Sequence, residues 1–174
     1  MIDARIEVSG LDALAAAFQR APDIAADEMV TAVLEASLLL EREVKERTPT
    51  AGGTTRESIA AQEPRILADR VVGEVASPLP HIAAVELGTR PHRPPVQPLA
   101  DWAKLKFGAD DAEATRIGHA VAAKIAARGT EGAFMFRDGL AANEAQVRDI
   151  VARGAARAAG RLAGTAADLD GAGA

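Results

Sequence analysis

Apolar and polar positions follow the period of a strand at the start of the chain and the period of a helix soon after. Residues 4–8 alternate, with Ile6 and Val8 on one face, which predicts a short strand. Apolar residues recur at helical spacing between residues 11 and 44, and Pro22 separates two helical pieces. We expect the second piece to be long and to end near Thr48-Pro49.

The middle of the chain predicts two antiparallel strands, at residues 66–67 and 71–75, around a tight turn. Four prolines make residues 90–98 unsuitable for a helix interior or a central strand, so we expect an extended loop there.

The last third predicts helices at residues 99–106, 110–128 and about 136–162, with Gly108 and Gly129 ending the first two. The third helix carries a narrow seam suited to close helix packing, formed by Leu140, Val147, Val151, Gly154, Ala158 and Leu162. We expect residues 1–163 to form one domain and residues 164–174 a flexible tail.

Composition favours an acidic subunit that packs against other subunits. Alanine accounts for 41 of the 174 residues, so few large side chains are left for a core, and neighbouring subunits would add stability. The net charge of −5 argues against bulk nucleic acid as the main partner. The N-terminus lacks a signal-peptide layout, and no apolar run is long enough for a membrane span, so we expect a cytoplasmic start and no membrane partner.

Candidate chemistry is sparse. The chain has no cysteine, its three histidines lie in separate segments without zinc-ligand spacing, and the 51–55 loop lacks a phosphate-binding Gly-Lys-Ser/Thr. We therefore expect no catalytic activity, no cofactor and no metal. Arg153, Arg157 and Arg161 form one helix stripe, which either contacts an acidic partner or DNA or keeps the helix solvated. The i,i+4 pairs Glu41/Lys45 and Glu43/Arg47 predict a solvated helix face.

Two segments resemble a known family. Residues 47–59 (RTPTAGGTTRESI) resemble the P-x-x-T/G-x-L-R-x-S-I junction of the tail-completion, or neck, proteins of long-tailed bacteriophages. Residues 80–89 (PHIAAVELGT) resemble that family's P-Y-A-x-x-V/H-E-F-G-T segment, followed by its proline-rich loop. Residues 99–102 and 129–136 are similar to the long version of the family. Thr55 stands where the family usually has leucine, and His81 near a usual tyrosine.

The resemblance implies an α+β fold, in which a long N-terminal helix packs on a small antiparallel sheet, with additional C-terminal helices. It also implies a minor tail component that assembles as a homo-oligomeric ring, commonly six-fold, in the virion neck. The ring would join the tail tube and its terminator to the connector (adaptor or stopper) of the filled head, with DNA passing through its lumen.

In this picture two loops contact neighbouring subunits. Gly88 supplies backbone freedom at a turn, Thr89 bonds locally, and Glu86 pairs with Arg56 or Arg90; the alternative for Glu86 is an exposed charge at a helix end. The candidate interaction residues are Thr50, Gly52, Gly53, Arg56, Ser58, Glu86, Gly88, Thr89, Arg90, His92 and Arg93.

Other functions stay open at this stage. A tail terminator or a head-closure subunit is a close alternative, because such proteins are also small ring-forming α+β chains. A DNA-binding helper would use the arginine stripe, and a hydrolase would use His81, Glu86 and His92. The source is a phage, a resident prophage or a gene transfer agent.

Overall fold

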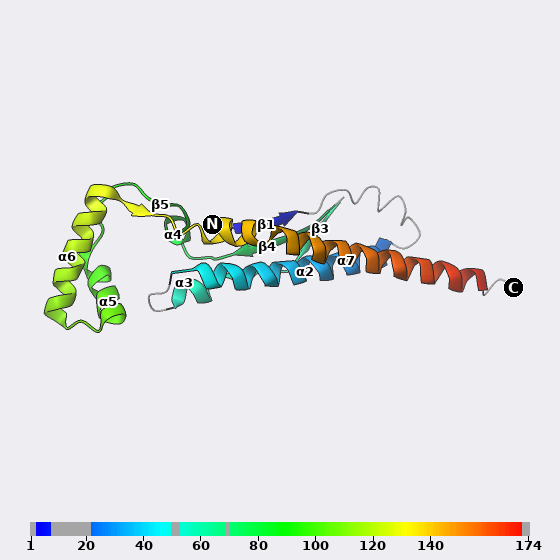
Figure 1. The fold of residues 1–174 in the computed structure, drawn as a ribbon, viewed down its shortest axis with the longest axis horizontal. Helices are drawn as coiled ribbons and strands as arrows, with labels where there is room; N and C mark the ends of the chain where they lie inside the picture. The colour runs from blue at the N-terminus through cyan, green and yellow to red at the C-terminus, as the bar shows by residue number, and fades with distance from the viewer. Residues whose placement is uncertain (1–2, 8–21, 50–52, 69, 172–174) are drawn as a thin grey trace.

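A computed structural model describes residues 3–7, 22–49, 53–68 and 70–171 of the chain. Its fold is α+β, and it has two parts. One part is an elongated body, in which two long helices lie along a small antiparallel sheet (Figure 1). The other is a helical hairpin at one end of the body. The predicted fold class is thus confirmed.

Helix α2 (Pro22–Arg47) and helix α7 (Met135–Gly171) form the long axis of the body. They run antiparallel, because Gly139 of α7 lies against Val44 and Gly154 lies against Ala32. A Cβ atom on Gly154 would lie only 2.4 Å from the Cβ of Ala32, so the glycine allows the close approach of the two helices. Val147 and Ala158 are also buried, which confirms the predicted seam.

The sheet is built around strand β4 (Arg70–Ala76). Strand β1 (Asp3–Glu7) pairs with one edge of β4, and β2 (Ala60–Ala61) and β3 (Arg65–Leu67) pair in succession with the other, all antiparallel. The predicted strand pair is confirmed. The predicted first strand is shifted by one residue, and Val8 lies outside the described residues.

One face of the sheet packs on the helices. A Cβ on Gly73 would lie 2.4 Å from Ser37 Oγ of α2, so β4 and α2 are in close contact at this point. The largest fully buried side chains of the body are Met29, Leu40, Ile59, Ile82 and Met135. The core therefore lies between the sheet, α2 and the first half of α7.

The hairpin consists of α5 (Val96–Phe107) and α6 (Asp111–Arg128). Gly108 ends α5 with φ 66°, and the Asp110 side chain accepts a hydrogen bond from the Glu113 backbone N–H (2.8 Å), which caps α6. Residues 90–128, the proline segment and the two helices, are called the arm below. The arm has its own small cluster of buried alanines, Ala100, Ala103 and Ala114.

Four short elements lie at the end of the body nearest the arm. Helix α3 (Thr54–Glu57) follows α2, and helix α4 (Ile82–Leu87) follows β4. Strand β5 (Gly88–Thr89) then leaves the body and pairs antiparallel with β6 (Thr130–Glu131), along which the chain returns. The arm is therefore joined to the body by a two-stranded ribbon (Figure 1).

Two sequence predictions are corrected at helix ends. The predicted loop at residues 90–98 ends earlier, because α5 begins at Val96. Pro98 is tolerated there, since the first-turn N–H groups of a helix have no partner within the helix. Helix α7 continues to Gly171, past the predicted end at residue 162. The predicted helical piece at residues 11–21 and residues 172–174 of the predicted tail lie outside the described residues.

Candidate functional site

The matched segments 80–89 and 129–136 meet at the junction between the body and the arm. Glu86 is only 3% exposed. Its carboxylate accepts hydrogen bonds from the backbone N–H groups of Phe136 (3.0 Å) and Arg137 (3.1 Å). These N–H groups lie in the first turn of α7, where backbone donors have no acceptor within the helix and the helix dipole favours negative charge. Glu86 therefore caps α7.

Both sequence interpretations of Glu86 are wrong. Its hydrogen-bond partners are backbone amides 50 and 51 residues away, not the side chains of Arg56 or Arg90. It is also not an exposed charge at a helix end, because the first turn of α7 covers it. No signal within residues 80–89 could have identified this partner.

The ribbon depends on glycine. Gly88 has φ 75°, which agrees with the backbone freedom expected of this glycine, and it lies where α4 ends and β5 begins. A Cβ at Gly88 would lie 2.3 Å from the Thr130 carbonyl oxygen, so any side chain would push the two strands apart. The hydroxyl groups of Thr89 and Thr130 are 3.0 Å apart. Thr89 thus bonds across the ribbon, which corrects the prediction of a local bond.

The second candidate loop is partly described. Thr50 and Gly52 lie outside the described residues. Gly53 precedes α3 with φ 84°, and Arg56 is exposed. Ser58 donates from its hydroxyl to the Thr55 carbonyl (2.7 Å) and lies 2.8 Å from the hydroxyl of buried Ser77. Ser58 therefore ties α3 to the end of β4.

His81 connects this loop to the junction. Its Nε2 lies 3.2 Å from the Thr55 hydroxyl, so α3 and the start of α4 are neighbours. The structure therefore brings the two matched segments, at residues 53–58 and 80–89, to the same end of the body.

The remaining candidates lie on the arm. Arg90, His92 and Arg93 are all exposed, and His92 Nδ1 lies 3.0 Å from the Arg90 carbonyl oxygen. Arg93 borders a groove of about 570 Å³ between the proline segment and α6, whose floor is mostly alanine. The described candidate residues thus form three groups: one at α3, one inside the junction and one on the surface of the arm.

The arginine stripe of α7 is paired within the chain. Arg157 and Arg161 each lie 2.9 Å from Glu28 of α2, and Arg153 lies 3.5 Å from Glu35. Hydrogen bonds from Arg157 and Arg161 hold the pKa of Glu28 below its ordinary value. The stripe therefore joins α7 to α2. Because its arginines are paired with carboxylates of α2, less of their positive charge is left to attract DNA.

The predicted ion pairs of α2 are present but do not form a purely solvated face. Glu41 pairs with Lys45 and also accepts a hydrogen bond from the Ala61 backbone N–H of β2 (2.8 Å). Glu43 pairs with Arg47 and also accepts from the amide of Asn143 on α7 (3.2 Å). Hydrogen bonds from Arg47, Arg42 and Asn143 lower the pKa of Glu43 to about 2. These carboxylates therefore connect α2 to its neighbours.

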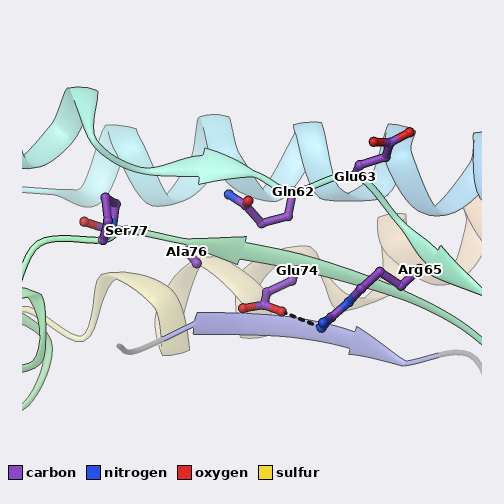
Figure 2. A pocket seen from close by; sticks show the side chains of 7 residues that line it. Gln62, Glu63, Arg65, Glu74, Ala76 and Ser77 are labelled. Atoms are coloured by element: carbon purple, nitrogen blue, oxygen red, sulfur yellow. Dashed lines mark hydrogen bonds and ion pairs between the residues drawn. The ribbon is translucent and has the colours of Figure 1, made fainter.

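A cleft of about 550 Å³ lies where the β2–β3 connection meets β4. Figure 2 shows Arg65 and Glu74 reaching toward each other across it, with 3.0 Å between Arg65 Nη2 and Glu74 Oε2. Glu63 points away from this pair. Arg65 and Glu74 therefore neutralise each other within the cleft, and Glu63 is the third charged residue that lines it.

Exposed apolar side chains are the feature that sequence reasoning missed. Within the described chain the large ones are Leu34, Leu38, Ile66, Leu67, Leu87, Leu105 and Phe107. Residues 105 and 107 follow Trp102 at the end of α5, and an apolar excess there was visible in the sequence.

Searches for other kinds of site and for relatives give the following results. In the described chain no three His, Asp or Glu side chains are grouped so that they could hold a metal ion. No helix in that part of the chain is long and apolar enough to cross a membrane. Comparison with protein-family models, curated proteins and solved structures gives no significant match.

Proposed function

We propose that this chain is a non-catalytic structural subunit of the head–tail interface of a long-tailed bacteriophage, prophage or gene transfer agent. In the virion it forms a homo-oligomeric ring, commonly six-fold in the family it resembles. The ring joins the tail tube and its terminator to the connector of the filled head, and DNA passes through the lumen.

The arm is the observation that carries this proposal. Its buried residues are three alanines and Gly118, while Leu105 and Phe107 near its tip are exposed. An isolated hairpin with so little core and exposed large apolar side chains is typical of a segment that packs on another subunit.

The junction gives further support. The fold class agrees with the one that the resemblance implies. In addition, Glu86, Gly88 and Thr89, which match the E-F-G-T part of the family pattern, join the arm to the body by specific contacts with residues 130–137. These residues therefore hold the arm to the body, which is a structural role expected of an assembly protein.

The test is binding to the parts of the particle. Purified protein is mixed separately with tails and with filled heads from the source particle, and the complexes are viewed by electron microscopy. We expect rings at the head-proximal end of the tail, and the distal end of the same tails is the internal control. Deletion of the gene should leave filled heads and complete tails unjoined.

Other outcomes point to the related roles or reject the proposal. Binding to heads alone would indicate a head-closure subunit. Tails of irregular length after gene deletion would indicate a terminator. Normal particles after gene deletion, with no binding to either part, would overturn the assignment.

A further inference from the structure

The bonds that join the arm to the body run through the ribbon. Among the described residues, every hydrogen bond, ion pair and ring contact of residues 90–128 is made within the arm or with Gly129. The alanine cluster of the arm is also separate from the core of the body. Figure 1 shows the helical hairpin standing off one end of the body, with the ribbon between them.

The body holds one end of the ribbon firmly. The Val85 and Glu86 carbonyl oxygens, in the last turn of α4, accept hydrogen bonds from the N–H groups of Ala133 (2.8 Å) and Phe134 (3.0 Å). The next residue, Met135, is fully buried in the core. The end of α4 and the start of α7 therefore belong to the body.

The arm holds the other end of the ribbon. The Ile125 carbonyl oxygen of α6 accepts hydrogen bonds from the N–H groups of Gly129 (2.8 Å) and His92 (3.4 Å). A Cβ on Gly118 of α6 would lie 3.1 Å from the backbone nitrogen of Ala100 on α5, so the two helices pack closely. The proline segment, α5 and α6 therefore form one unit.

A short stretch of chain separates these two anchored ends. It comprises residues 87–91 on the outgoing strand and residues 130–132 on the returning strand. None of these residues is buried, and Leu87 is 64% exposed. Local motion costs least where little apolar surface is buried and the backbone hydrogen bonds are exposed to water.

Two glycines face each other where the ribbon leaves the body. A Cβ on Gly132 would lie 3.0 Å from the backbone nitrogen of Gly88, so the two residues are at the same level on the two strands. Glycine adopts a wide range of φ and ψ values, and hinges are often built from such small residues. A rotation at this level needs no side chain of either glycine to repack.

We infer that the arm swings as a rigid unit about a hinge at Gly88 and Gly132. The hinge presents the exposed residues of the arm, Leu105 and Phe107 among them, at a range of angles to the body. A partner that binds the arm then selects one of these angles. The inference goes beyond the proposed function and concerns the single chain, so it can fail while the assignment to the head–tail interface stands.

Pairs of nitroxide labels measure the swing. The chain has no cysteine, so two introduced cysteines are the only attachment points. The arm–body pair is Glu46→Cys with Ala112→Cys. The body pair is Glu46→Cys with Ala156→Cys, and the arm pair is Asp101→Cys with Ala127→Cys. All these positions are exposed, so the variants should fold, which circular dichroism checks.

Double electron–electron resonance gives the distribution of distances for each pair. Labelled chains are diluted with an excess of unlabelled chains, so that only distances within one chain are measured. We expect the arm–body distribution to be at least about twice as wide as those of the body pair and the arm pair. An arm–body distribution as narrow as that of the body pair would overturn the inference, as would an arm pair as wide as the arm–body pair.

A substitution at the hinge tests where the rotation takes place. A Cβ on Gly132 would lie 2.4 Å from the Glu86 carbonyl oxygen, so Gly132→Ala should displace the ribbon and change the mean arm–body distance. The body pair and the arm pair should keep their wild-type distances. Gly160→Ala, where a Cβ meets nothing within 4 Å, is the matched control and should change none of the three. An unchanged arm–body distance in Gly132→Ala, or a change in either of the other pairs, would overturn a hinge at this position.

Discussion

The body and the arm are both rich in alanine, but they are stabilised in different ways. The body buries large side chains between its helices and its sheet, among them Leu40, Ile59 and Met135. The arm buries Ala100, Ala103 and Ala114, with Trp102 and Ile117 only partly covered. Burying a large apolar side chain stabilises a fold by about 1.5–3 kcal/mol, far more than an alanine methyl does.

This difference separates two tasks within one chain. The body buries large side chains within the single chain, whereas the arm buries little and leaves Leu105 and Phe107 uncovered. Assembly would then add to the arm the apolar burial that the single chain lacks. Variants of the junction, the body and the arm separate these contributions.

The largest effect is expected at the cap of α7. Glu86→Ala removes the acceptor of two backbone N–H groups and should lower the free energy of unfolding on the order of 3 kcal/mol, since each unsatisfied buried donor costs roughly 1–3 kcal/mol. Urea unfolding followed by circular dichroism measures it. Glu144→Ala, which removes only an exposed ion pair with Arg148, should change stability by less than about 1 kcal/mol. Equal effects of the two variants would contradict the capping role.

The seam between the long helices comes next. Gly154→Ala should destabilise the body by about 1–3 kcal/mol, because its Cβ would overlap Ala32. Gly160→Ala is the matched control on the same helix, where a Cβ meets nothing within 4 Å. That control should stabilise the helix by about 0.5–1 kcal/mol. Thermal unfolding of both variants gives the comparison, and a stabilised Gly154→Ala chain would rule out the close packing.

The ribbon should respond locally. Gly88→Ala places a Cβ against the Thr130 carbonyl at a φ of 75°, so the β5–β6 pairing should open. Hydrogen exchange of residues 129–132 should become faster in this variant. Gly108→Ala has a similar φ of 66° but meets no atom within 4 Å, so it isolates the contribution of backbone conformation. The same ribbon exchange in both variants would show that the close contact is unimportant.

The smallest effect on overall stability is expected in the arm. Trp102→Ala removes the largest side chain packed against the alanine cluster and should unfold α5 and α6 locally. Hydrogen exchange over residues 96–128 should rise, while the unfolding temperature of the body stays within about 2 °C of the wild type. A large fall in that temperature would mean that the two parts unfold as one unit.

Much of the fold was predictable because its signals are local. The long helix from Pro22, the strand pair before and after residue 69, and the capping glycines Gly108 and Gly129 follow from short-range patterns. The strands at residues 60–61, 88–89 and 130–131 were not predicted, because two residues carry no periodicity and their pairing depends on distant partners.

The candidate site was predicted less completely. Gly88 was expected to need the backbone freedom of glycine, and its φ of 75° agrees with that expectation. Ser58, however, is used inside the fold to bind Ser77, and no pattern in the sequence marked Leu105 and Phe107 as exposed. Exposure depends on which elements pack together, and a helical pattern alone does not say which apolar side chain remains uncovered.

By itself the sequence determined the main helices, the glycine seam of α7 and the acidic balance of the chain, since these depend on residue type and spacing. Only the tertiary structure decided that Glu86 caps α7, that Thr89 pairs with Thr130, and that Glu28 holds Arg157 and Arg161. Those partners lie between 41 and 133 residues apart along the chain. Contacts over such separations arise only when the body packs, so no local pattern could specify them.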